Sequence, residues 1–120
     1  MAPPTTPTLR DGHAHLRTPH GDLPLEVAAS PRTRLRGLLG RDHITSALLL
    51  TPTRSIHTLL MRVPIDVAYL DGHWTVLEVH TMKPNRIGWP RWRARHVVET
   101  AAGVMHRHGI QPGTELKIIW

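Results

Sequence analysis

The chain has 120 residues, a length that fits one domain built around a single hydrophobic core. It has no cysteine, which excludes disulfides, thiolate nucleophiles and cysteine-ligated zinc. The formal net charge is +6, from 15 basic and 9 acidic residues, and all the basic residues except Lys83 and Lys117 are arginine. This surplus favours anionic partners such as phosphate, nucleic acid or a lipid headgroup, although an arginine bias can also reflect genomic base composition.

Nothing in the sequence resembles a targeting segment. Residues 1–8 are rich in Pro and Thr, lack the basic start and apolar run of a signal peptide, and are predicted to form a disordered tail. The longest apolar run is Ala47–Leu50, whereas a membrane span needs about 20 apolar residues. We therefore expect a cytoplasmic protein without a membrane span, in which residues 9–120 fold as one domain.

The first part of the chain predicts two strands and a short helix. Residues 9–22 show little pattern, whereas Leu23–Ala28 alternates apolar and polar residues, as a half-buried strand does. Segment 30–40 predicts a helix, because Ser and Pro begin it, leucines three and four residues apart share one face, and Gly ends it. Ala47–Leu50 predicts a buried strand.

The middle of the chain predicts an extended segment and a β-hairpin. Residues 55–61 are expected to be extended, and a proline then precedes a strand at Ile65–Leu70. Asp71 and Gly72 favour a tight hairpin turn, after which Trp74–Val79 returns as the second strand.

The last part of the chain predicts a loop, two strands and a short helix. The loop covers 81–93, the strands are His96–Glu99 and Glu115–Trp120, and the helix is 101–108, with Thr100 as its cap. Six or seven strands with two short helices predict an α+β domain that is mainly antiparallel β. The sheet is expected to curl, or to close into a small barrel.

Four segments of the chain carry a resemblance to a known family. They are Arg34–Arg41 (RLRGLLGR), His57–Asp71 (HTLLMRVPIDVAYLD), Val97–Gly103 (VVETAAG) and His108–Thr114 (HGIQPGT). Their order and spacing within residues 25–115 resemble the prokaryotic family catalogued as domain of unknown function 192. The resemblance implies a compact β-rich fold with short helices, and it implies no activity, because the biochemistry of that family is unassigned.

A first candidate site gathers polar residues near the start of the predicted hairpin. His57, Thr58, Arg62 and Asp66 could form a small site for a polar or anionic ligand, with Arg62 binding the anion. The alternative is structural, because a buried aspartate at a strand start often accepts backbone N–H bonds and a nearby arginine completes the network. Burial separates the two readings: an enclosed Arg62–Asp66 pair without an adjacent pocket would be structural.

A second candidate site is the basic, tryptophan-containing segment 83–96, which has no acidic residue. The predicted anion-binding residues are Lys83, Arg86, Trp89, Arg91, Trp92, Arg93 and Arg95. In an extended conformation the last three arginines would share one face, with Trp92 and Ala94 on the other. Such a strip could follow a phosphate backbone while tryptophan stacks on a base, or bind anionic lipid or an acidic protein. The structural alternative is a solvated loop that its tryptophans pin to the core.

Other chemistries find less support in the sequence. A Ser-His-Asp set can be written with Ser55, but no nucleophile-elbow pattern surrounds it, and no phosphate-binding glycine loop exists. The pairs His13/His15 and His106/His108 lack the partners that a metal site needs. We therefore expect no catalytic residue, no metal and no cofactor. The leading hypothesis is a non-enzymatic binding or accessory domain, and the alternative is a polyanion-binding domain that uses segment 83–96.

Overall fold

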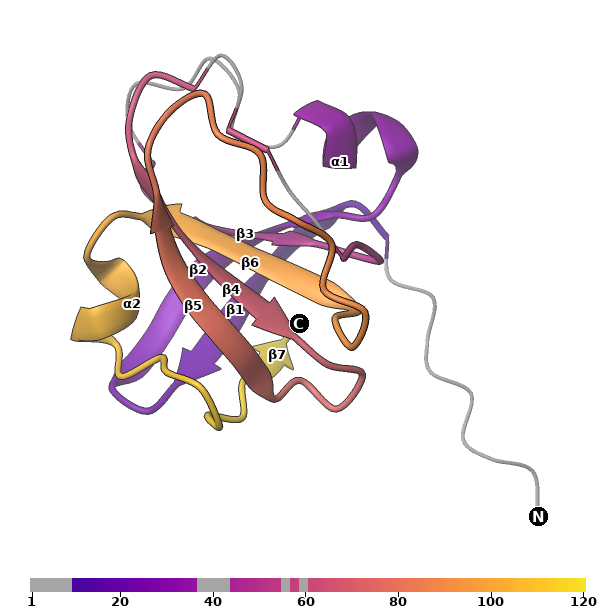
Figure 1. The fold of residues 1–120 in the computed structure, drawn as a ribbon. Helices are drawn as coiled ribbons and strands as arrows, with labels where there is room; N and C mark the ends of the chain where they lie inside the picture. The colour runs from indigo at the N-terminus through magenta and orange to yellow at the C-terminus, as the bar shows by residue number, and fades with distance from the viewer. Residues whose placement is uncertain (1–9, 37–43, 55–56, 59–60) are drawn as a thin grey trace.

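The computed structural model describes residues 10–36, 44–54, 57–58 and 61–120, and within these ranges it contains seven strands and two short helices (Figure 1). The strands are β1 (Gly12–Thr18), β2 (Gly21–Ala28), β3 (Ala47–Leu50), β4 (Ile65–Leu70), β5 (Val76–Met82), β6 (His96–Ala101) and β7 (Lys117–Ile119). The helices are α1 (Pro31–Arg36) and α2 (Val104–Arg107). The predicted α+β class with a mainly antiparallel sheet is therefore confirmed.

All seven strands belong to one mixed sheet, in the order β5-β4-β6-β3-β2-β1-β7. Only β2 and β3 pair in parallel, and their connection contains α1. The other pairs are antiparallel. Strand β4 lies between β5 and β6, and all six of its residues are buried because side chains cover both of its faces.

The two faces of β4 enter two different hydrophobic clusters. Ala68 and Leu70 belong to the inner cluster, around which the sheet curls and which also contains side chains of β1, β2, β3, β6 and α2. Val67 and Tyr69 belong to the outer cluster, which Met61 and Ala94 cover from the loops before β4 and before β6. Successive strand residues point to opposite faces, so this division follows from the alternation alone.

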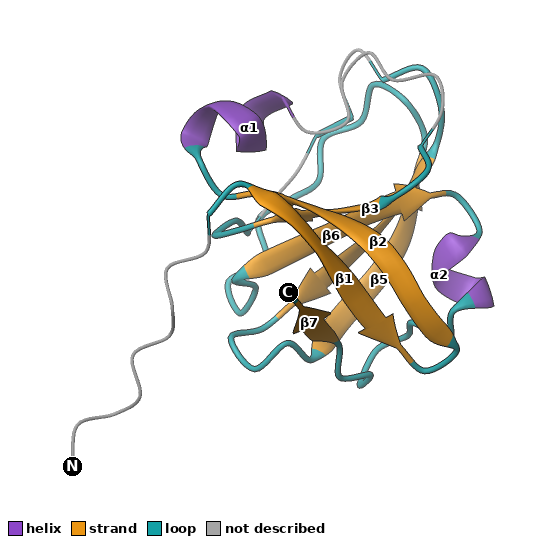
Figure 2. Ribbon diagram, turned by 180° about the vertical axis from the view of Figure 1, so that it is seen from behind, coloured by secondary structure: helices purple, strands orange, loops and turns teal. Residues whose placement is uncertain are grey.

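The sheet curls strongly but is not closed into a barrel, so the closed-barrel alternative is not what forms (Figure 2). Its outer strands β5 and β7 do not pair with each other as strands. They are connected near one end by hydrogen bonds from Val76 N to Thr114 O, 2.8 Å, and from Leu116 N to Trp74 O, 3.0 Å. The inner cluster is thereby enclosed from both edges of the sheet.

Strand β1 is the element that the sequence pattern did not predict. Ala14, Leu16 and Thr18 are buried, and the residues between them are exposed. Alanine and threonine give a weak apolar signal, so the period of two is hidden until β2 pairs alongside. In α1 the expected apolar face is not buried where the structure describes it, because Leu35 is 71% exposed. The other two leucines of that prediction, and most of segment 55–61, lie outside the described residues.

The hairpin between β4 and β5 is present, but its connection is longer than a tight Asp-Gly turn. Asp71 Oδ1 accepts hydrogen bonds from His73 N at 2.9 Å and Thr75 N at 3.0 Å, which organises a wider loop. The residue with positive φ is Trp74, at 64°, and not Gly72. The Trp74 ring stacks on His96, with ring centroids 3.8 Å apart, and the second strand begins at Val76 instead of Trp74.

Helix α2 is shorter than the predicted helix 101–108, because β6 continues to Ala101 before the chain turns. Gly103 takes a φ of 92° at the helix start, a conformation that glycine adopts without steric cost. The expected cap, Thr100, instead donates its hydroxyl hydrogen to Ala101 O. None of the helices among the described residues has the length and apolar character needed to cross a membrane.

Candidate functional site

Asp66, one of the four residues of the first candidate site, lies on the inner face of β4 and points toward α2. Its side chain accepts hydrogen bonds from Thr81 Oγ1 at 2.7 Å, Gly103 N at 2.8 Å and Met105 N at 3.3 Å. It is 4% exposed. The carboxylate therefore connects β4, β5 and the start of α2, as a structural aspartate does.

His57 and Thr58 lie over the opposite, outer face, beside the loop that follows β5. Thr58 is fully buried, donates to Lys83 O at 2.7 Å and accepts from Arg86 N at 2.7 Å. His57 pairs by one β-bridge with Ile87, and its Nδ1 is buried without a hydrogen-bond partner. Arg62 is exposed. The structure therefore does not bring Asp66 and Thr58 into one site, because Asp66 points to the inner face of β4 whereas Thr58 contacts the loop after β5.

Replacing Thr58 by valine should lower the free energy of unfolding by about 1 kcal/mol, because Arg86 N loses a buried acceptor while the side-chain volume is kept. Urea denaturation measures the change. Thr45→Val, at an exposed threonine before β3, is the control. A Thr58→Val protein as stable as the wild type would contradict the anchoring role of Thr58.

Segment 83–96 is not an extended strip. Ala94 N donates to Arg91 O at 2.9 Å, so residues 91–94 form a turn that places Ala94 in the outer cluster with no exposed surface. Trp89 is 81% exposed and Trp92 is 78% exposed. The tryptophans therefore do not pin the loop to the core. On that point the structural interpretation of segment 83–96 is wrong.

Arg91 holds the loop to the sheet in place of the tryptophans. Its Nε donates to Glu78 Oε2 at 3.0 Å, and its guanidinium carbon lies 4.7 Å from the centroid of the Tyr69 ring. His80 Nε2 lies 2.9 Å from the other oxygen, Glu78 Oε1. The hydrogen bond from His80 lowers the pKa of Glu78, burial opposes it with the next largest effect, and the hydrogen bond from Arg91 lowers it again, so the pKa stays below its usual value. Glu78 is thus ionised at neutral pH.

A cleft of about 390 Å³ opens beside this network. It is lined by Leu77, Glu78, Pro90, Arg91, Trp92 and Arg93. Leu77, Pro90 and Trp92 supply apolar walls, and the Glu78 side chain, still 42% exposed, supplies acceptors. A mostly apolar hollow with a few charged groups is typical of a small-ligand subsite.

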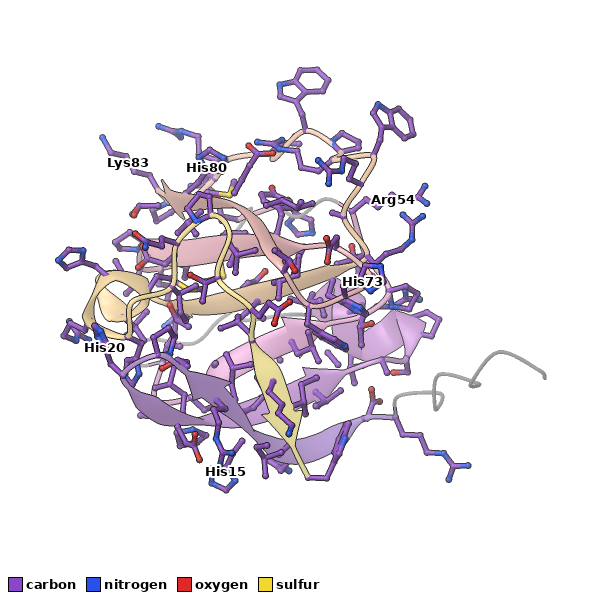
Figure 3. The ribbon with its side chains drawn as sticks, turned by 90° about the horizontal axis from the view of Figure 1, so that it is seen from below. His15, His20, Arg54, His73, His80 and Lys83 are labelled. Carbon is purple, nitrogen blue, oxygen red and sulfur yellow. The ribbon has the colours of Figure 1, made fainter. Side chains whose placement is uncertain are left out.

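Segment 83–96 exposes both cationic and large apolar side chains. We call them together the Trp/Arg surface: Lys83, Arg86, Ile87, Trp89, Trp92, Arg93 and Arg95, with Arg54 from the neighbouring loop. Arg91 N donates to Arg54 O at 2.9 Å, which holds the two loops together. Figure 3 shows that Lys83, His80 and Arg54 lie along the same side of the molecule. The structure therefore places six of the seven predicted anion-binding residues on this surface, and uses the seventh, Arg91, to support it.

Sequence reasoning did not assign Tyr69, Glu78 and His80 to this surface. The available signal was the alternation in β5, because Glu78 and His80 are two residues apart on a strand and must share a face. Pairing in the sheet then places Glu78 opposite Tyr69. Their meeting with Arg91 depends on the path of the loop, which no local pattern specifies.

The histidine pairs do not form a metal site among the residues that the structure describes. No group of three His, Asp or Glu side chains there could hold an ion. His13 and His15 share the exposed face of β1, as their spacing predicts. His108 Nδ1 lies 3.0 Å from Thr18 Oγ1, and His20 Nδ1 lies 3.0 Å from Arg107 O, so these imidazoles connect α2 to the β1–β2 turn.

Fold and surface together describe a curled sheet whose loop before β6, joined by Arg54, carries exposed cations and two exposed tryptophans. The family model DUF192, described as "Uncharacterized ACR", matches residues 14–118. The chain therefore belongs to the DUF192 family, which confirms the resemblance found in the sequence.

Archaeal proteins are among its relatives. A UPF0127 protein of Pyrococcus abyssi is 34% identical over 100 residues, 79% of this chain and 86% of that protein. A UPF0127 protein of Pyrococcus horikoshii is 41% identical over 66 residues, 55% of this chain and 56% of that protein. The chain thus spans little more than half of that second relative, and 64% of a third from Thermococcus sibiricus, which is 32% identical over 98 residues.

Two solved structures share the fold. A protein of Sinorhizobium meliloti 1021, described as a candidate transcription regulator, superposes with a TM-score of 0.76 at 24% identity, covering 92% of this chain and 96% of that one. A protein of unknown function from Novosphingobium aromaticivorans superposes with a TM-score of 0.73 at 18% identity, covering 98% and 93%. At these identities the likeness concerns the fold alone.

Proposed function

We propose that this domain is a binding module for a polyanion, and that single-stranded nucleic acid is the partner class that its Trp/Arg surface fits. The observation that carries the proposal is the exposure of Trp89 and Trp92, at 81% and 78%, within a segment that has no acidic residue. Tryptophan carries a large apolar ring, and two mostly exposed tryptophans in one loop offer apolar area that a partner can cover.

The two kinds of exposed side chain match the two parts of a nucleic acid strand. Cations neutralise phosphates and release counterions, whereas an indole ring stacks on a base for about 1–3 kcal/mol per base. Unstacked bases occur in single strands, which is why the proposal names them. A non-enzymatic accessory role in the cytoplasm, the expectation from the sequence, goes with this proposal.

The first candidate site supports a function less well. Thr58 forms hydrogen bonds with the protein backbone, and Asp66 forms them with the backbone and with Thr81. Strand β4 lies between the two side chains. A ligand that used Asp66 and Thr58 together would have to reach both faces of β4, so a joint small-ligand role for His57, Thr58, Arg62 and Asp66 is the weaker candidate. We therefore place the anion-binding role on the Trp/Arg surface.

Binding of a fluorescent single-stranded oligonucleotide at several salt concentrations tests the proposal. We expect affinity to fall steeply with salt, and the triple variant Lys83→Ala, Arg86→Ala, Arg93→Ala to reduce the log–log slope by about 2, since each phosphate contact on a single strand contributes about 0.7. The control removes the same charges elsewhere on the surface, as Arg10→Ala, Arg107→Ala and Lys117→Ala, and should keep the wild-type slope.

An absence of binding at low salt, or an equal loss of slope in both triple variants, would contradict the proposal.

Ile87, which is 71% exposed in the same loop as the tryptophans, favours a second partner, an anionic lipid surface. Sedimentation with phosphatidylserine vesicles distinguishes the two. Binding to vesicles without binding to oligonucleotides would transfer the function to membranes.

A further inference from the structure

The cleft beside Glu78 holds a feature that phosphate binding does not need. A carboxylate repels phosphate, yet Glu78 lines the cleft in the middle of a basic surface and keeps 42% of its side chain exposed. His80 lies beside Oε1 and Arg91 donates to Oε2, so each printed contact occupies a different oxygen. A carboxylate has about four lone-pair sites on its two oxygens, so each oxygen can accept a further hydrogen bond from a group in the cleft.

The walls of the cleft suit a flat ring. Trp92 and Pro90 lie on the loop side and Leu77 on the β5 side, and the volume of about 390 Å³ is ample for one nucleobase. Arg93 lines the same cleft and can bind the phosphate of the nucleotide whose base enters it. Arg91 bound to Glu78 and stacked on Tyr69 keeps the carboxylate in place before a ligand arrives.

We propose that this cleft is a guanine-selective base subsite of the strand that binds the Trp/Arg surface, with Glu78 as the acceptor for the base edge. This inference rests on the proposed function. Guanine presents two adjacent N–H donors, N1–H and the 2-amino group, which match the two parallel acceptors of a carboxylate. Adenine and cytosine present one amino group next to a ring-nitrogen acceptor, and uracil presents one N–H between two carbonyl oxygens, so both arrangements oppose a carboxylate.

The test uses the full chain and nine-nucleotide RNAs of uridine whose central position is guanosine, adenosine, cytidine or uridine. We expect the guanosine strand to bind about tenfold more tightly than the other three, the discrimination typical of one bidentate base contact. Inosine at the centre removes only the 2-amino group and should lose most of this preference. The 7-deazaguanosine strand changes the opposite edge of the base and should keep it.

Protein variants then locate the preference. Glu78→Gln should abolish the ratio between guanosine and uridine strands, whereas Glu115→Gln, at an exposed glutamate next to β7, should leave the ratio unchanged. Equal binding of all four strands would overturn the guanine subsite while leaving the proposed function intact. Failure of every strand to bind would overturn both. A guanosine preference that inosine retains would overturn the bidentate contact, because the 2-amino group would then contribute nothing to recognition.

Discussion

Replacing Asp66 by alanine is expected to lower the free energy of unfolding by about 3 kcal/mol, the largest effect we predict for one substitution in this chain. The carboxylate is 4% exposed and accepts bonds from the backbone of Gly103 and Met105 and from the hydroxyl of Thr81. Alanine leaves these three donors without their acceptor inside the protein. It also disconnects the start of α2 from β4, so the helix loses the carboxylate that replaces an ordinary cap.

Urea denaturation of the full chain measures this loss, with Asp22→Ala as the matched control. Asp22 pairs with Arg17 at 3.2 Å, but both side chains are largely exposed, so its removal should cost well under 1 kcal/mol. Asp66→Asn keeps one acceptor oxygen and should fall between the two. If Asp66→Ala proves as stable as the control, the carboxylate is not a structural connection, and a ligand role for Asp66 becomes open again.

The second large effect is a loss of stability on acidification that depends on His96. Burial, followed by the charge of Arg95, lowers the pKa of His96 to about 4 against the opposing influence of Asp71. The unfolded chain has the ordinary histidine pKa near 6.5, so between these values the unfolded state binds more protons than the folded state. Stability should therefore fall as the pH is lowered from 7 to 5, by about 1–2 kcal/mol from this residue, because part of the imidazole remains open to solvent.

His96→Phe tests this contribution because phenylalanine can still stack on Trp74 but cannot take up a proton. The variant loses the contact between His96 Nδ1 and Thr51 Oγ1, which are 2.6 Å apart, so its stability at pH 7 serves as its own reference. We expect the pH 7 to pH 5 difference in unfolding free energy to shrink by about 1–2 kcal/mol relative to the wild type. His15→Gln on the exposed face of β1 is the control. An unchanged difference in His96→Phe would show that other groups cause the acid sensitivity.

Several elements were predictable because their signals are local. Ala47–Leu50 is an apolar run and Ile65–Leu70 is apolar except for Asp66; both are bounded by turn residues, and both are buried strands of the sheet. The two short helices start near the predicted residues. Within the described part of the chain, each helix is shorter than its sequence pattern predicts. Strand β1 was not predicted because its buried positions include alanine and threonine, which are too weakly apolar to make the alternation visible.

The two candidate sites also differ in how far local sequence could predict them. Composition alone singled out segment 83–96, since five cations, two tryptophans and no acid within 14 residues need no three-dimensional information. The grouping of Asp66 with Arg62 and Thr58 relied on closeness in sequence. The structure separates Asp66 from Thr58, because Asp66 follows Ile65 on a strand and therefore points to the face opposite the outer cluster.

By itself, the sequence determined the family, the strand-rich class, the positions of the buried strands and the concentration of positive charge in one loop. These properties follow from the order of residue types within short windows. Only the tertiary structure decided that Trp89 and Trp92 are uncovered, that Arg91 is bound to Glu78 over Tyr69, and that Asp66 supports α2. Each of these properties depends on which distant segment packs over a side chain. The free energy of that packing depends on both segments and not on either one alone.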